Sequence, residues 1–327
     1  MEKGVGIRDE NYSGGWGGGA SCTEIQARVI LAPCDGVISS SLRSLFCSHS
    51  NPLPPPRLAP VQCVLWGHPS TTGYRYMDYF LTSDLYSSPM EGDKFSEQLV
   101  RFQGLTFDFK TPEWIDRAVE GEYSKKDTPG YELPSNPYVL IPQSMQKFHP
   151  SFDSVIRHVA RSGYDVVAVY DAKKPLWMQR LLTRIVGDSG EAEGSGPIQK
   201  RVWFVPTVGR DDYARIVEGA GIVVDPFPFG GGVTTLEILH RCKVVVTCGE
   251  CQSVPRLTEG MYRHVGVEGG VVGSEREVAE RTVELMGDEV RRGEMERELC
   301  KRKGGLYDGK AQDMGEWEGW LEKVGRG

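Results

Sequence analysis

The residues that point most clearly to chemistry lie between positions 225 and 237 and read DPFPFGGGVTTLE. An apolar run predicts a strand that leads into a rigid Pro/Phe corner, three glycines and the start of a helix. Glycine lets the backbone approach a ligand and adopt positive φ. Thr234 and Thr235 offer hydroxyl groups, and a first helical turn offers free N–H groups and positive potential. This pattern predicts an anion site suited to a diphosphate.

Glu237 lies one turn into the same predicted helix, where a carboxylate can bond ribose hydroxyls. The alternative interpretation of this segment is a glycine-rich turn followed by a capped helix. The segment is neither G-x-G-x-x-G nor a P-loop with G-K-[ST], so the common nucleotide motifs do not decide between the two interpretations.

The elements that must position these residues alternate between strand and helix in the second half of the chain. Strands are expected at 138–142, 165–170, 202–205, 221–225 and 243–247, and helices at 152–160, 176–186, 210–218, 234–240, 275–286, 289–300 and 314–324. In the first half, strands are expected at 27–31, 61–66, 77–82 and 95–102, and a short helix at 42–46. This order predicts βαβ units, a parallel sheet and an α/β fold.

The chain has 327 residues, enough for two α/β domains. Residues 1–57 form a first segment that is Gly-rich at 13–20, and a Pro-rich connector follows at 52–60. Residues 58–130 are predicted to form a partial amino-terminal lobe, and residues 131–327 a nucleotide-binding lobe with carboxyl-terminal helices. The polar composition of 110–137 is typical of a connection between domains.

The composition argues against several classes of partner. The formal net charge of −7 makes nucleic acid an unexpected principal partner. No apolar run approaches the ~18 residues of a membrane span, and the start of the chain has no apolar signal core. We therefore expect an intracellular protein, cytoplasmic or nuclear, without a membrane partner.

Eight cysteines are dispersed along the chain, and one pair, Cys248 and Cys251, forms a C-x-x-C motif. A zinc site needs a second pair of ligands, and no second pair occurs at a suitable spacing. We expect free thiols in a reducing compartment. A redox role for the C-x-x-C pair is the alternative.

Five blocks of sequence, taken in order, resemble one known family. DPFPFGGGVTTLE, followed by VVVTC, is similar to the nucleotide-sugar loop of the protein O-GlcNAc transferase family (glycosyltransferase family 41). The other four blocks are LAPVQCVLWGHPSTTG with MDYFLTSD (58–84), FSEQLVRFQGL (95–105), IPQSMQKFHPSFD (141–153) and FVPTVGRDDYARI (204–216). Together they cover roughly residues 58–270.

The resemblance implies a GT-B fold, with two Rossmann-like lobes and the donor in the cleft between them. Here the amino lobe is expected to be incomplete, and the chain has no tetratricopeptide repeat of ~34 residues. The implied activity is inverting transfer of N-acetylglucosamine from UDP-GlcNAc to Ser or Thr of an acceptor protein. No cofactor and no metal are implied besides the donor, since the chain has no D-x-D carboxylate cluster.

Two alternatives to that activity remain. One is a nucleotide-sugar-binding protein, or a fragment, that does not catalyse transfer. The other is a protein O-fucosyltransferase that uses GDP-fucose, as a plant relative does.

The resemblance also assigns roles to single residues. Lys147 matches the lysine that contacts the donor diphosphate, where a fixed cation stabilises the leaving UDP. Thr234 and Thr235 match the pair that holds the diphosphate at a helix N-terminus. Other positions expected to contact the donor are Gln143, Arg210, Tyr213, Gly231, Gly232, Val233 and Glu237, with Arg210 and Glu237 near the ribose. Tyr213 and Val233 stand where animal members have histidines around the uracil, which leaves the base open.

Gly67, His68 and Pro69 match a loop near the donor sugar. His68 can act as an acid or base because the pKa of histidine lies near neutrality. The other reading is a loop histidine that bonds backbone or ligand. The proposed catalytic histidines of the family lie upstream of residue 58, and Val29 stands about where one would align. Three explanations of this departure upstream of residue 58 stay open: a truncated sequence, an inactive chain or a different acid–base system.

Overall fold

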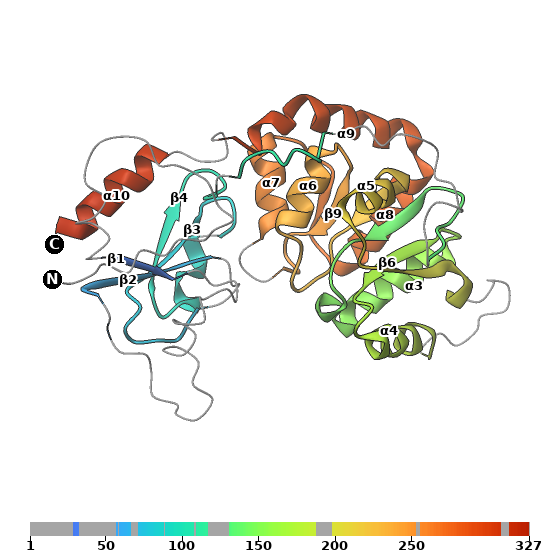
Figure 1. The fold of residues 1–327 in the computed structure, drawn as a ribbon, viewed down its shortest axis with the longest axis horizontal. Coiled ribbons are helices and arrows are strands. Elements are labelled where there is room, and N and C mark those ends of the chain that lie inside the picture. Colours follow the sequence, from blue (N-terminus) through green and yellow to red (C-terminus); the bar gives the residue numbers. More distant parts are fainter. Residues whose placement is uncertain are drawn as a thin grey trace.

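The computed structural model of the chain describes residues 29–32, 57, 59–66, 71–87, 89–107, 109–116, 131–187, 198–252, 256–308 and 314–326. Within these residues, two separate parallel sheets lie side by side along the long axis of the molecule (Figure 1). The predicted α/β class and the two-lobe arrangement are therefore confirmed. The helix expected at 42–46 lies outside the described residues.

The first sheet has the strand order β1-β2-β3-β4, and all its pairs are parallel. Its strands are β1 (Val29–Ala32), β2 (Val61–Leu65), β3 (Tyr79–Ser83) and β4 (Gln98–Phe102), with the 3-10 turn η1 (Pro89–Lys94) before β4. Strand β1 pairs with β2 from Val29 to Ala32. A segment expected to lie outside the lobe, within residues 1–57, thus contributes a strand to it.

The carboxyl-terminal helix α10 (Met314–Arg326) lies beside this first sheet (Figure 1). Its residues Trp317, Trp320 and Leu321 pack on a cluster formed by Cys63, Leu81 and Phe102. The rings of Phe102 and Trp317 stack with centroids 4.1 Å apart. This differs from the predicted boundary, which placed all of 131–327 in the second lobe. The apolar face of the helix is buried on the other sheet, a contact that the order of elements along the chain does not reveal.

The second sheet has the strand order β10-β9-β8-β5-β6-β7, again with parallel pairs. Its strands are β5 (Tyr138–Ile141), β6 (Val166–Tyr170), β7 (Val202–Pro206), β8 (Ala220–Val224), β9 (Val245–Cys248) and β10 (Val271–Val272). Every residue of β5 and β8 is buried. Parallel strands covered on both faces need such continuous apolar runs. The chain therefore builds outward from a central β5 in two directions.

Helices cover this second sheet and bury its faces (Figure 1). They are α3 (Asp153–Arg161), α4 (Pro175–Gly187), α5 (Arg210–Gly219), α6 (Val233–His240), α7 (Leu257–Val265), α8 (Glu275–Gly287) and α9 (Glu289–Arg302). The 3-10 turns are η2 (Met145–Lys147), η3 (Pro150–Phe152), η4 (Ile198–Arg201) and η5 (Lys303–Gly305). All predicted helices of this half are present; α7 is additional.

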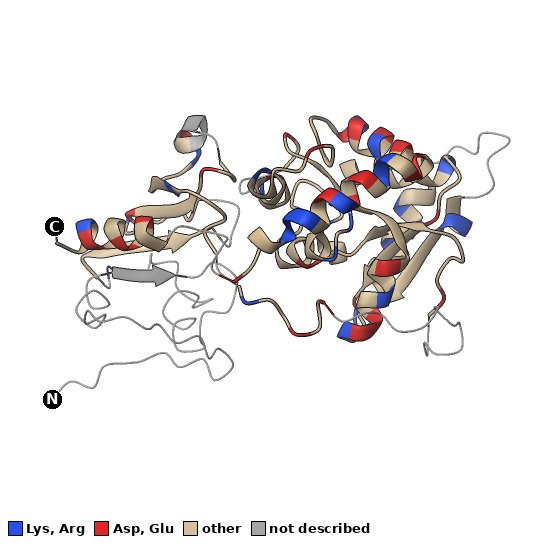
Figure 2. Ribbon diagram, turned by 90° about the horizontal axis from the view of Figure 1, so that it is seen from above, with Lys and Arg blue, Asp and Glu red and all other residues tan. Residues whose placement is uncertain are grey.

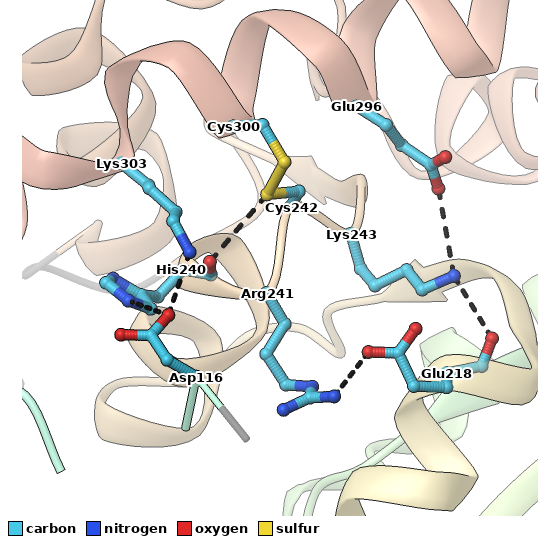
Figure 3. Close-up of a disulfide and its surroundings, with 9 residues drawn as sticks. All are labelled: Asp116, Glu218, His240, Arg241, Cys242, Lys243, Glu296, Cys300 and Lys303. Atoms are coloured by element: carbon cyan, nitrogen blue, oxygen red, sulfur yellow. Dashed lines mark hydrogen bonds and ion pairs between the residues drawn. A yellow bond between two sulfur atoms is a disulfide. The ribbon is translucent and has the colours of Figure 1, made fainter. Parts of the chain in front are cut away.

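Two disulfides are present among the described cysteines. Cys242, directly after α6, is bonded to Cys300 on α9, with a Cα–Cα distance of 5.0 Å (Figure 3). Cys248 is bonded to Cys251. The prediction of free thiols is therefore wrong for these four residues. The packing of α9 against α6 brings Cys242 and Cys300 within bonding distance, and their spacing of 58 residues gives no local signal of it.

The described part of the connection between the lobes is tied to the carboxyl end of α6 (Figure 3). Asp116 contacts His240 Nε2 at 3.1 Å and accepts a hydrogen bond of 2.9 Å from Lys303. Arg241 donates a hydrogen bond of 2.8 Å to the carbonyl oxygen of Ile115. These contacts fix the connection to the helix whose opposite end faces the candidate site.

Figure 2 shows that Lys and Arg alternate with Asp and Glu along the helices of the second lobe. Several of these charges form pairs within a helix or between neighbouring helices, such as Arg276–Glu280, Arg281–Glu284 and Lys301–Glu298. Within the part of the chain that the structure describes, no helix has the length and apolarity needed to cross a membrane.

Candidate functional site

The candidate site lies where the strand order of the second sheet reverses. The chain runs from β5 to β6 and β7 on one side and then crosses to β8, β9 and β10 on the other. In open α/β sheets, ligands bind outside the carboxyl ends of the strands at such a reversal. Two loops leave the sheet there: residues 142–147 follow β5, and residues 225–232 follow β8.

Lys147 joins these two loops. Its ammonium group donates hydrogen bonds of 2.7 Å to the carbonyl oxygen of Gly230 and 2.9 Å to Gln143 Oε1. It also lies 4.6 Å from the centre of the Phe229 ring. Burial lowers the pKa of Lys147, and the charge of Asp225 acts in the opposite direction. The structure thus places a partly desolvated cation against the glycine loop, as the sequence comparison of these segments led us to expect.

Asp225 lies beneath the glycine loop and is 2% exposed. Its carboxylate accepts hydrogen bonds from Gly231 N at 2.5 Å, Thr258 Oγ1 at 2.7 Å and Thr247 Oγ1 at 3.1 Å. Burial raises the pKa of Asp225 to about 6, although these bonds and the charge of Lys147 lower it. No site role is predicted for Asp225 from the sequence. The sequence feature that could have indicated Asp225 is an acidic residue directly after a fully apolar strand.

The glycines of the loop are required by close packing. A Cβ atom on Gly230 would meet the Asp225 carboxylate, and one on Gly231 would meet Thr235 Oγ1 and Gln143 Nε2. Gly230, Gly231 and Gly232 do not adopt positive φ, so that part of the prediction is wrong. The backbone is close to the side chains beneath it, and only glycine leaves room for them.

Helix α6 begins at Val233 with Gly232 as its N-cap and no side-chain cap. The first bond within the helix runs from Leu236 N to the Gly232 carbonyl oxygen. The amides of Val233, Thr234 and Thr235 therefore have no acceptor within the helix, which leaves donors for an anion. Val233 itself is 53% exposed at the helix start.

The two threonines at this helix start point in different directions. Thr234 lines a cavity beside the loop. Thr235 is 1% exposed, and its hydroxyl oxygen lies 3.4 Å from Thr258 Oγ1. The Thr235 hydroxyl therefore faces the interior, whereas the Thr235 amide stays available at the helix start for the diphosphate contact predicted for this pair. Its side chain points inward to Thr258, because successive residues on a helix face different sides.

The cavity has a volume of about 360 Å³. Its walls come from residues 142–146, the end of β6 at 169–171, residues 207–208, and the side chains of Lys174, Trp177, Tyr213, Ile216 and Thr234. Of the predicted donor residues, Gln143, Tyr213 and Thr234 line it. Lys147, Arg210 and Glu237 are not part of its lining, although Lys147 contacts Gln143.

Tyr213, Glu237 and Arg210 influence one another electrostatically across α5 and α6. The hydroxyl of Tyr213 is buried and has no hydrogen-bond partner among the described residues. Burial raises the pKa of Tyr213 above its usual range, and the charge of Glu237 adds to this. Burial also raises the pKa of Glu237, while Arg210 lowers it. Because the hydroxyl is sealed from solvent, Tyr213 contributes its ring rather than its hydroxyl to the cavity wall.

Gly67, His68 and Pro69 lie outside the described residues. Among the residues that are described, no group of three or more His, Cys, Asp or Glu side chains has the geometry of a metal site.

No protein-family model matches the chain. A search of curated proteins finds the UDP-glucose:protein N-beta-glucosyltransferase of Actinobacillus pleuropneumoniae serotype 5b, 24% identical over 93% of this chain and 45% of that protein. It also finds the probable UDP-N-acetylglucosamine–peptide N-acetylglucosaminyltransferase SPINDLY of Solanum lycopersicum, 26% identical over 71% of this chain and 24% of that protein. The chain thus spans less than half the length of these relatives.

Among solved structures, a mutant of the Thermobaculum terrenum O-GlcNAc transferase superposes with a TM-score of 0.64 and 20% identity, over 83% of this chain and 49% of that one. At this identity the match concerns the fold alone. The ordered sequence blocks, the relatives and the shared two-sheet architecture agree. The predicted resemblance is confirmed: the chain has the GT-B fold and is similar in sequence to protein glycosyltransferases.

Proposed function

We propose that this chain is the donor-binding and catalytic part of a protein glycosyltransferase that uses a UDP-sugar. The observation that carries the proposal is the contact of Lys147 with Gly230, 2.7 Å from ammonium nitrogen to carbonyl oxygen, beside the open start of α6. A cation and three helix-start amides at one place form the arrangement that a diphosphate needs. The names of both curated relatives describe sugar transfer from a UDP-sugar to a protein or peptide, which supports the same class of reaction.

In this proposal the two loops hold the leaving group. Lys147 and the amides of Val233, Thr234 and Thr235 would bind the diphosphate oxygens. The acceptor atom attacks the anomeric carbon as the bond from that carbon to the diphosphate oxygen breaks, so negative charge grows on the departing UDP. Preorganised donors stabilise that charge more in the transition state than in the ground state, which is the origin of the rate enhancement.

The cavity of about 360 Å³ is the proposed nucleoside site. It lies within the ~300–1,000 Å³ of ordinary ligand pockets. Ile216 and the ring of Tyr213 supply apolar walls, while Gln143 supplies a polar group. Glu237 and Arg210 do not line this cavity, and they remain proposed ribose contacts on the strength of the sequence alone. His68 remains a proposed acid or base on the strength of the sequence alone.

The donor sugar proposed from the sequence is N-acetylglucosamine, with a Ser or Thr hydroxyl as the acceptor. The name of the tomato relative supports this donor. The second candidate donor is UDP-glucose, favoured by the Actinobacillus relative, whose match extends over 93% of the chain. The N-linked product in that relative's name makes a side-chain amide the second candidate acceptor.

The test is donor binding and transfer by the purified chain. Calorimetry would measure the affinity of UDP-GlcNAc, UDP-glucose and GDP-fucose, and mass spectrometry would follow sugar transfer to peptides bearing Ser, Thr or Asn. We expect a UDP-sugar to bind and GDP-fucose not to bind. Binding without transfer would instead support a non-catalytic nucleotide-sugar-binding protein. Absence of binding by every UDP-sugar would refute the proposal.

A further inference from the structure

We propose that Asp225 is a positioning residue of the donor site: its buried carboxylate holds the glycine loop and the start of α6 in the geometry that binds a diphosphate. This inference rests on the proposed function and extends it to a residue that contacts no donor itself.

Three elements of the fold converge on the Asp225 carboxylate. Gly231 N comes from the loop, Thr247 Oγ1 from β9 and Thr258 Oγ1 from α7, at 2.5, 3.1 and 2.7 Å respectively. One carboxylate oxygen accepts from the loop and the other from both threonines. The carboxylate thus links the loop to two elements of the rigid second lobe, which a neutral side chain with a single carbonyl oxygen cannot do equally well.

The glycine loop has little conformational freedom around that carboxylate. Gly231 has no room for a Cβ because Thr235 Oγ1 and Gln143 Nε2 lie there. Thr235 Oγ1 in turn lies 3.4 Å from Oγ1 of Thr258, which donates to Asp225. The position of the loop therefore depends on the same cluster that orients the first turn of α6.

Burial of the ionised Asp225 carboxylate costs folding free energy. Asp225 is fully buried, and burial raises its pKa to about 6, from an ordinary 3.8. The native state therefore takes up a proton at a higher pH than the unfolded chain, and the contribution of this group to stability falls as pH rises from about 3.8 to about 6. Ionised Asp225 thus opposes folding at neutral pH, which is expected of a residue retained for binding geometry.

The charged and titratable groups around Asp225 are few among the described residues. Lys147 faces it from the loop after β5. Tyr262 faces it from α7 and donates its hydroxyl proton to the Val245 carbonyl oxygen. On β9, Cys248 is in a disulfide and does not titrate. Asp225 is therefore the group of this cluster that changes charge near pH 6.

The experiment compares Asp225→Asn with the parent chain. The probes are UDP-glucose and UDP-GlcNAc, because free UDP carries a terminal phosphate that itself titrates near pH 6. Calorimetry from pH 5 to pH 8 is expected to show about tenfold weaker binding by the variant at pH 7.5. The parent should lose affinity as pH falls below about 6, where Asp225 takes up a proton. The variant should lack this loss of affinity at low pH, the acid limb of the binding profile.

Removal of a negative charge would by itself favour a bound anion. A fall in affinity therefore identifies lost loop geometry as the larger effect. Equal or tighter binding by Asp225→Asn, or an unchanged acid limb, overturns the proposal.

A second variant tests the same claim if Asp225→Asn does not fold. Thr258→Val removes a hydrogen bond that lowers the pKa of Asp225, so the acid limb should move to higher pH. Thr282→Val is the matched control, since Thr282 is equally buried but bonds the Val278 carbonyl oxygen of its own helix. An acid limb that Thr258→Val leaves in place overturns the proposal.

One readout separates this inference from the proposed function. If the parent binds no UDP-sugar, the proposed function fails, and hydrogen exchange of residues 226–236 then decides the inference alone. Exchange is compared as protection factors, because the intrinsic exchange rate itself falls as pH falls. Lower protection in Asp225→Asn than in the parent at pH 7.5, and in the parent below pH 6 than at pH 7.5, supports the inference. Equal protection overturns it.

Discussion

The ammonium group of Lys147 and the carbonyl oxygen of Gly230, 83 residues apart in the chain, are joined by a hydrogen bond of 2.7 Å. The bond connects the loops after β5 and β8, the two strands that flank the reversal of strand order. A single side chain therefore brings positive charge to the open end of α6. This relationship makes Lys147 the first residue to test.

Replacement of Lys147 by alanine is expected to weaken binding of a UDP-sugar by roughly 10- to 100-fold. A hydrogen bond to a charged group contributes about 1.5–3 kcal/mol, and the variant removes the proposed diphosphate cation. Calorimetry at pH 7.5 measures the change. Lys200→Ala is the control, because Lys200 is exposed and directly precedes β7, an edge strand of the sheet, whereas the site follows the central strands β5 and β8. Unchanged affinity in Lys147→Ala would remove Lys147 from the site.

Replacement of Gly231 by alanine is expected to lower the free energy of unfolding by ~1–3 kcal/mol and to weaken donor binding, because the added Cβ has no room. It would overlap Thr235 Oγ1 and Gln143 Nε2. Gly187→Ala, at the end of α4, provides the control, since a Cβ there meets no atom within 4 Å. Urea unfolding and calorimetry check both effects. Equal stability of the two variants would show that the loop tolerates a side chain.

Loss of the Cys242–Cys300 disulfide is expected to destabilise the second lobe by about 4 kcal/mol, the chain-entropy value for a loop of this length. The bond closes a separation of 58 residues, whereas Cys248–Cys251 closes one of 3. The paired variants Cys242→Ser with Cys300→Ser and Cys248→Ser with Cys251→Ser should differ accordingly in urea unfolding. A thiol assay on the native parent that detects Cys242 and Cys300 as free would contradict the expectation.

Replacement of Trp317 by alanine is expected to release α10 from the first sheet. The ring stacks on Phe102 at 4.1 Å, and Glu316 on the same helix accepts a hydrogen bond from Gln103 N. Limited proteolysis should cleave residues near α10 several-fold faster, because a partly buried aromatic side chain contributes about 1–3 kcal/mol. Glu318→Ala, an exposed position on the same helix, is the control. Identical cleavage rates in both variants would contradict this packing.

The sequence by itself determined the α/β class and nearly every element of the second lobe. Hydrophobic runs and helix patterns are local properties, so the strands at 138–142 and 221–225 were predicted to within a residue or two of β5 and β8. The order of the matching blocks also led to Lys147 and the glycine loop as parts of one site. Helix α7 was missed, although its residue Thr258 donates a hydrogen bond to Asp225.

Tertiary structure alone decided the directions of side chains and the contacts between distant residues. Thr234 and Thr235 are neighbours, yet the turn of α6 sends one to the cavity and the other inward to Thr258. The Cys242–Cys300 bond and the packing of α10 on the first sheet likewise depend on how elements are placed in space. Local patterns encode periodicity and turns, but burial and pairing are properties of the packed molecule, so no short stretch of sequence specifies them.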